Sequence, residues 1–109
     1  MILNIKGQNY KIFYSYELFD AHTFDEGYPK ESYVDGYCDT KQKEIYLYIG
    51  ENNKVDTTCL HELIHAYLFE SGLHQTCENE FLCDFFAGNI LSIVKQGKTI
   101  TDQIEGERK

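Results

Sequence analysis

The chain has 109 residues, of which 42% are hydrophobic and 26% charged, and its formal net charge is −8. This length suggests one domain of ordinary globular composition. The acidic balance argues against nucleic acid and against an anionic membrane surface as partners, because both require clustered Lys and Arg. No stretch approaches the roughly 20 apolar residues of a membrane span. The first residues do not form an apolar signal segment, so we expect a cytoplasmic protein.

The first half of the chain predicts four strands. Residues 2–6 and 9–15 are rich in Ile, Tyr and Phe and are separated by a short turn, which favours a hairpin. Residues 16–31 predict a short helix or a loop. A second pair of strands is expected at residues 32–38 and 44–49, joined by a polar turn.

The second half of the chain predicts two helices, which follow a loop at residues 50–56. Asp56 is a candidate N-cap for a helix over residues 57–71, and Gly72 can end that helix. A second helix is expected over residues 77–96.

The expected end of the second helix sets the C-terminal boundary of the domain. Thr76 is the candidate N-cap, and Gly97 suits the position just past the last turn. Residues 98–109 are polar and are expected to form a frayed tail. The sequence therefore predicts a single domain at residues 1–97.

The segment HELIH supplies the strongest chemical signal. His61 and His65 are four residues apart, so on a helix they lie on one face and can offer imidazole nitrogens to one metal ion. Glu62 lies beside that face, where it can reach a metal-bound water. A catalytic zinc ion takes three protein ligands and keeps one position open, so a third donor is expected downstream.

Spacing tests three candidates for that donor. The pattern HExxHxxGxxH would need Gly at 68 and His at 71, but the chain has Leu68 and Ser71. His74 follows in the expected loop between the helices. Glu80 and Asp84 lie one turn apart near the start of the second helix, and antiparallel packing of the two helices would bring them to the histidines. We expect Glu80 to bind the metal and Asp84 to accept the N–H of His61.

HELIH followed by NEFLCD resembles the gluzincin arrangement HExxH and NExxxD, with a shorter gap. The small size and the framing of residues 33–95 are similar to the minimal metallopeptidases of the ImmA/IrrE type, which occur in phages and mobile elements. The resemblance implies His61, His65 and Glu80 as zinc ligands. It also implies Glu62 as general base and Asp84 as the partner that supports His61.

Four cysteines and three tyrosines are further candidates. We expect all four cysteines to be reduced thiols without a metal role, because no pair has ligand spacing: Cys38, Cys59, Cys77 and Cys83. Tyr33, Tyr37 and Tyr67 are candidates for stabilising an oxyanion, although packing of an aromatic ring is the better explanation for each of them.

The sequence predicts an α+β, zincin-like fold in which a small, mainly antiparallel sheet packs on the HExxH helix and a second helix follows. The expected function is zinc-dependent hydrolysis of a peptide bond, with the substrate extended along strand 32–38 or strand 44–49. Two alternatives are a metal-stabilised binding module that recognises a regulatory protein without cleaving it, and a structural metal site. The expected partner is a protein or peptide substrate, with a regulator such as a repressor as one option.

Overall fold

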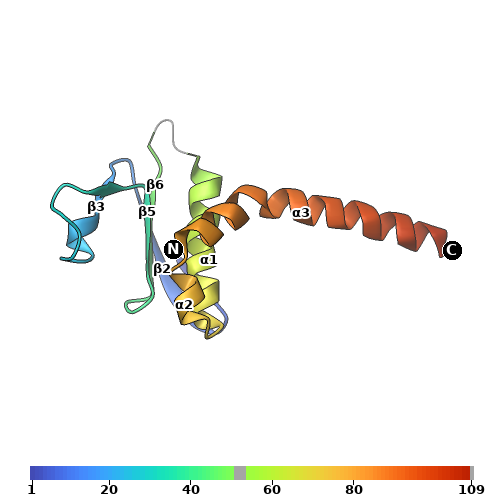
Figure 1. The fold of residues 1–109 in the computed structure, drawn as a ribbon, viewed down its shortest axis with the longest axis horizontal. Coiled ribbons are helices and arrows are strands. Elements are labelled where there is room, and N and C mark those ends of the chain that lie inside the picture. Colours follow the sequence, from blue (N-terminus) through green and yellow to red (C-terminus); the bar gives the residue numbers. More distant parts are fainter. Residues whose placement is uncertain (51–53, 109) are drawn as a thin grey trace.

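A computed structural model describes residues 1–50 and 54–108, so part of the expected loop at 50–56 and the last residue of the expected tail lie outside the described residues. The chain forms three layers (Figure 1), with a small insertion on one face of a sheet and helices on the other. The elements are, in chain order, β1 (Ile2–Ile5), β2 (Gln8–Ser15), β3 (Phe19–Asp20), the 3₁₀ helix η1 (Ala21–Thr23), β4 (Tyr33–Val34), β5 (Gly36–Asp39), β6 (Glu44–Tyr48), α1 (Val55–Glu70), α2 (His74–Cys77) and α3 (Glu80–Glu107).

The main sheet has four strands in the order β1-β2-β6-β5. Both predicted hairpins are present, because β1 pairs antiparallel with β2 and β5 pairs antiparallel with β6. The central pair, β2 and β6, is parallel. Lys6 and Gly7 both have positive φ, at 50° and 92°, which is the two-residue turn that suits the twist of a hairpin. The predicted α+β class with a small, mainly antiparallel sheet is confirmed.

The predicted strand at residues 32–38 is in fact two strands. β4 pairs with β3 in a separate two-stranded sheet, and only β5 joins the main sheet. An aromatic cluster packs the insertion against the main sheet. Phe24 stacks on Tyr37 with ring centroids 4.3 Å apart, and Phe19 meets Tyr46 at 5.6 Å.

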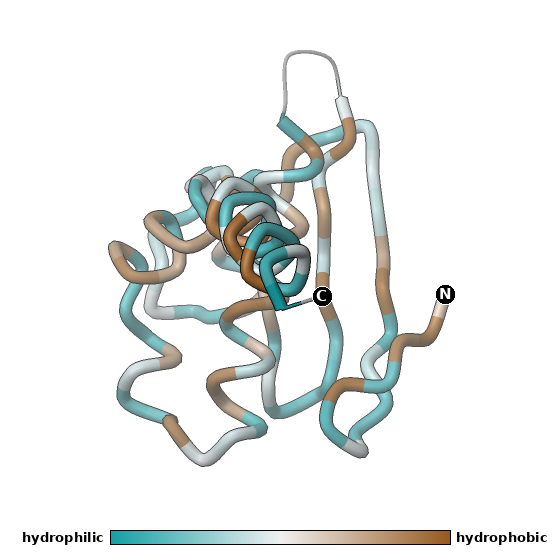
Figure 2. Tube along the Cα trace, turned by 90° about the vertical axis from the view of Figure 1, so that its right-hand side faces the viewer, coloured by the Kyte–Doolittle hydropathy of each residue, from teal (hydrophilic) through white to brown (hydrophobic). Residues whose placement is uncertain are grey.

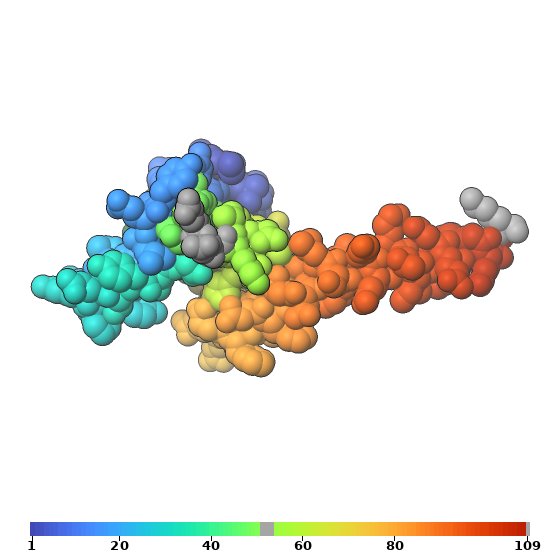
Figure 3. Space-filling model, turned by 90° about the horizontal axis from the view of Figure 1, so that it is seen from above, coloured from blue at the N-terminus to red at the C-terminus, as the bar shows by residue number. Residues whose placement is uncertain are grey.

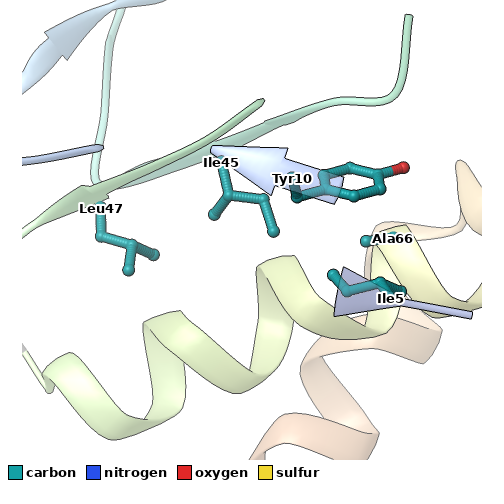
Figure 4. Close-up of a cluster of buried hydrophobic side chains, with 5 residues drawn as sticks. All are labelled: Ile5, Tyr10, Ile45, Leu47 and Ala66. Atoms are coloured by element: carbon teal, nitrogen blue, oxygen red, sulfur yellow. The ribbon is translucent and has the colours of Figure 1, made fainter. Parts of the chain in front are cut away.

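The core lies between the sheet and α1 (Figure 4). Alternate residues of β6 point the same way, so Ile45 and Leu47 both face the helix, where Ala66 lies. Ile5 and Tyr10 complete the buried cluster from β1 and β2. This packing holds α1 against the sheet along the stretch that carries both histidines of HELIH.

A polar cluster closes the core at the end of α1. Tyr10 donates a hydrogen bond of 2.8 Å to Glu70, and Lys43 forms an ion pair of 2.6 Å with the same carboxylate. The Glu70 side chain is only 10% exposed. Burial by itself would raise the pKa of Glu70, but the hydrogen bonds from Lys43 and Tyr10 and the charge of Lys43 outweigh it and lower that pKa. The carboxylate is therefore held in its charged form.

We predict that Glu70→Gln lowers the free energy of unfolding by about 1–2 kcal/mol near neutral pH, because the substitution weakens charge-assisted hydrogen bonds. The folded-state pKa of Glu70 is lowered, so its contribution is present above the unfolded-state pKa and is lost as the pH falls through the folded one. Urea unfolding across acidic pH measures both effects. The exposed Glu17→Gln is the control, and an equal loss in both variants would contradict the prediction.

Helix α1 begins at Val55, two residues before the predicted start, with Lys54 at the N-cap position. Asp56 therefore lies in the first turn, where its charge suits the helix dipole. The predicted end is confirmed, because Gly72 has φ of 81° and its N–H donates to the Phe69 carbonyl. The N–H of the next residue bonds the Leu68 carbonyl, which completes a Schellman motif.

The prediction that Thr76 caps the second helix is wrong. A short helix, α2, occupies the connection, and α3 begins at Glu80 after its N-cap Asn79. The Asn79 side chain accepts a hydrogen bond from the N–H of Leu82. Asn is among the best N-cap residues, and here it prevails over Thr76 because the chain has first to turn through α2.

The prediction that the helix stops at Gly97 and that residues 98–109 fray is also wrong. Helix α3 continues to Glu107. Gly97 is not among the glycines with positive φ, and a glycine in helical conformation costs only about 1 kcal/mol relative to Ala. The last turns also hold two ion pairs, Lys98 with Asp102 and Arg108 with Glu105.

The second half of α3 projects away from the body of the molecule (Figures 1 and 3), which gives extents of 61 × 33 × 27 Å. Within the described residues, no helix combines the length and the apolar character that crossing a membrane requires.

Candidate metal site

Two helices bring the predicted site residues together. Helix α1 carries His61, Glu62 and His65, and its i, i+4 spacing places both imidazoles on one face. The first two turns of α3 carry Glu80 and Asp84, which face the same histidines. These five side chains are therefore neighbours, although the two helices contribute them from separate parts of the chain.

Three of these side chains form a tight triangle of donor atoms. The Nε2 atom of His61 lies 2.8 Å from one oxygen of Glu80 and 3.1 Å from Nε2 of His65. The other oxygen of Glu80 lies 3.1 Å from Nε2 of His65. Ligands of a tetrahedral zinc ion, at about 2.1 Å from the metal, are about 3.4 Å apart. A shift of a few tenths of an ångström would therefore open the triangle to that size.

The far nitrogen of each histidine has an acceptor. Nδ1 of His61 lies 2.8 Å from Oδ1 of Asp84, which is the contact that the sequence predicts. Nδ1 of His65 bonds the backbone carbonyl of Cys77, at the end of α2. A carboxylate and a carbonyl only accept hydrogen bonds, so each Nδ1 carries a proton. Each Nε2 faces an oxygen of Glu80 and can bind a metal once it carries no proton.

The triangle is arranged to hold a positive charge. Two Nε2 atoms and a carboxylate converge, and with neutral imidazoles they repel one another unless a proton or a metal ion lies among them. His61, His65 and Glu80 could together hold a metal ion. The Glu80 side chain is 70% exposed, while those of His61 and His65 are 15% and 9% exposed, so the site opens to solvent on the α3 side.

Glu62 lies beside the triangle in a buried position, and it is only 5% exposed. Burial, strengthened by the negative charges of Glu80, Asp35 and Asp84, raises the pKa of Glu62 to about 8. A cation bound in the triangle would lower the pKa of Glu62 instead, because a nearby positive charge favours the ionised carboxylate.

Gly36, on β5, makes room for the Glu62 side chain. A Cβ atom at position 36 would lie 2.6 Å from Oε2 of Glu62 and 3.1 Å from the Thr58 methyl group. The sequence by itself does not reveal this role of Gly36. Its proximity to Glu62 arises from the packing of β5 on α1, which no local pattern encodes.

A cleft of about 1130 Å³ runs past these residues between β4, β5, α1 and the start of α3. Tyr33 and Tyr37 line it, as does Tyr28, which the sequence did not single out. Tyr67 is not among the residues that line it. The Tyr37 ring stacks on Phe24, and this contact gives it a structural role.

His74, the other candidate ligand, also lines the cleft. Its ring stacks on Phe69 with centroids 4.2 Å apart. The group of side chains that could hold a metal does not include it. The structure therefore favours Glu80 over His74 as the third donor.

All four cysteines are free, as predicted. Burial raises the pKa of each thiol, and that of Cys83 reaches about 12. A raised pKa keeps the thiol protonated and unreactive. The group that could hold a metal contains no cysteine. Cys83 instead packs against the site, with its sulfur 3.5 Å from Nδ1 of His65.

Comparisons with protein-family models, with curated proteins and with solved structures found no match for this chain. The fold and the site together define an α+β protein with a candidate metal site of two histidines and one glutamate.

Proposed function

We propose that the protein is a zinc-dependent peptidase with a zincin-like site. The observation that carries the proposal is the triangle of His61, His65 and Glu80, together with the buried carboxylate of Glu62 beside it. The resemblance of HELIH and NEFLCD to the gluzincin motifs supports the same function.

In this proposal the three side chains of the triangle hold zinc. Imidazole and carboxylate are donors that zinc accepts, and three protein ligands leave one position open, as in catalytic zinc sites. When bound, zinc would polarise the scissile carbonyl and lower the pKa of a water molecule toward about 7. Asp84 and the Cys77 carbonyl keep both rings oriented, because each holds an Nδ1 proton.

Glu62 acts as the general base in the proposed reaction. Its carboxylate takes a proton from the attacking water and passes it to the leaving amine. No described residue donates a hydrogen bond to Glu62, so the carboxylate is available to a water molecule. This position is what favours hydrolysis over the binding-module and structural alternatives, because neither of those needs a buried base beside the metal.

The substrate would lie along β5, in an extended conformation. Strand β6 lies between β2 and β5, so the expectation that strand 44–49 supplies an open edge is wrong. The N–H of Tyr48 donates to the Asp35 carbonyl. Because antiparallel pairing alternates, Gly36 and Cys38 turn their backbone groups toward the open edge. A peptide can pair with this edge through main-chain hydrogen bonds.

The test is hydrolysis of a mixed peptide library by the purified protein. We expect cleavage by protein loaded with zinc, loss of cleavage after chelation and recovery when zinc is restored. Elemental analysis of the protein as purified identifies the metal that it carries. Cleavage that persists in chelated protein would overturn the proposal, as would a dialysed protein that takes up no zinc.

We predict that Asp84→Asn weakens zinc binding about 10–100-fold, because an amide holds the His61 Nδ1–H less strongly than a carboxylate does. Competition with a chelating dye measures the dissociation constant. Asp102→Asn, an exposed position further along α3, is the control and should leave zinc affinity unchanged. Equal affinities in the two variants would show that Asp84 does not support the ligand.

A further inference from the structure

The projecting half of α3 exposes an apolar stripe that nothing in the described chain covers. Large aliphatic side chains recur along it, and Ile93, Ile100 and Ile104 are 48%, 61% and 45% exposed. Figure 3 shows this part of the helix standing clear of the body, and Figure 2 shows apolar residues recurring along it. Helices in water owe most of their stability to packing of an apolar face, so this segment needs a partner.

The spacing of the stripe is that of a coiled coil. Ile90, Ile93, Gly97, Ile100 and Ile104 follow one another at intervals of three and four residues. Residues 86–107 thus offer about three heptads with one continuous seam, over roughly 33 Å.

The surface of the helix carries a shallow hollow on this stripe. The hollow is lined by Ile100, Gln103, Ile104 and Glu107. These positions are i, i+3, i+4 and i+7, the four residues that form the hole for one knob of a facing helix.

The charges beside the seam permit pairing with an identical helix. The flanking positions are neutral up to the last turn, with Asn89, Gln96 and Gln103 on one side and Val94 and Thr101 on the other. The last turn adds two charged residues. Glu107 continues the seam three residues after Ile104, and Arg108 beside it pairs with Glu105 of its own helix. Over residues 89–103, two copies therefore meet without like-charge repulsion.

The two parts of the chain differ in net charge. Residues 1–85 contain six Lys against fifteen Asp and Glu, a net charge of −9, whereas residues 86–109 carry a net charge of +1. A parallel pair of helices would place the two acidic bodies side by side. An antiparallel pair places them at opposite ends, where their repulsion is weak.

We propose that two copies of this chain associate through an antiparallel coiled coil of α3, residues 86–107. The interface is isologous, since the same seam serves both copies. The two clefts then lie at opposite ends of the dimer, away from the interface. The proposal is independent of the metal site and of the proposed peptidase activity.

The experiment is sedimentation equilibrium of the full chain from about 1 to 100 μM at moderate salt. We expect a mass approaching twice 12.7 kDa. Small-angle X-ray scattering of the same samples should give a pair-distance distribution with two maxima, because the bodies are separated by the paired helices. A single maximum would overturn the antiparallel arrangement.

Two matched variants test the seam. Ile93→Asp with Ile100→Asp should weaken the dimer at least about 100-fold, because each substitution buries a charge in the interface. Ser92→Asp with Thr99→Asp puts the same charges one residue earlier, about 100° around the helix and outside the seam, and should leave the mass unchanged. A monomeric wild type would overturn the proposal and leave a different protein as the occupant of the stripe. A dimer that survives Ile93→Asp with Ile100→Asp would also overturn it.

Discussion

For the proposed peptidase, we expect Glu62→Gln to keep the metal and the fold but to lower kcat about 10²–10⁴-fold, the range that a general base contributes. The amide has nearly the same shape as the carboxylate, so it fits beside Gly36, where a Cβ atom would come within 2.6 Å of the side chain. It cannot take up the proton of the attacking water. The measurement is kcat on a peptide that the wild type cleaves, with zinc content determined on the same samples.

The control for this variant is Glu78→Gln. Glu78 also lines the cleft but is not part of the group that could hold a metal. We expect its kcat to stay near that of the wild type. Hydrolysis by Glu62→Gln at the wild-type rate would show that Glu62 is not the base. A loss of zinc from that variant would instead show that Glu62 is needed for the metal site.

His65→Ala removes a donor from the triangle. Loss of a group that only supports a ligand typically costs about 10–100-fold in metal affinity, and we expect the loss of His65 to lower zinc affinity further than that. The His65 side chain is only 9% exposed, and its ring is held by the Cys77 carbonyl. Apart from His61, which already serves as a ligand in this proposal, no imidazole belongs to the group that could hold a metal, so none can replace His65 without movement of the chain. Equilibrium dialysis followed by elemental analysis measures the loss.

His74→Ala is the matched control, because His74 lines the same cleft and stacks on Phe69 outside the triangle. Its zinc affinity should match that of the wild type. Full zinc occupancy in His65→Ala would contradict the proposed ligand set. Loss of zinc in His74→Ala would instead restore His74 as a ligand.

Local patterns predicted the elements that carry the site. The i, i+4 spacing of His61 and His65 identified a shared helix face, and the one-turn spacing of Glu80 and Asp84 identified the facing pair. The expected contact between Asp84 and His61 is present, at 2.8 Å. Helix geometry repeats regularly, so spacing along the sequence translates directly into side-chain direction.

The helix ends were less predictable because they depend on competing caps. Thr76 and Asn79 are both good N-cap residues, and the sequence alone does not say which one the chain uses. Because the chain first turns through α2, Asn79 becomes the N-cap of α3, and Glu80 lies in the first turn of that helix. Gly97 similarly suited a helix end, yet its φ is not positive and the helix continues past it.

The sequence by itself determined the helix face that carries the candidate ligands, the two hairpins and the absence of ligand spacing among the cysteines. Only the tertiary structure decided that β6 is an inner strand, that β5 is the open edge and that Gly36 lies against Glu62. The physical reason is the range of the interactions. Helix faces and hairpins depend on neighbours within a few residues, whereas the parallel pairing of β2 with β6 and the packing of β5 on α1 join segments that are far apart in the chain.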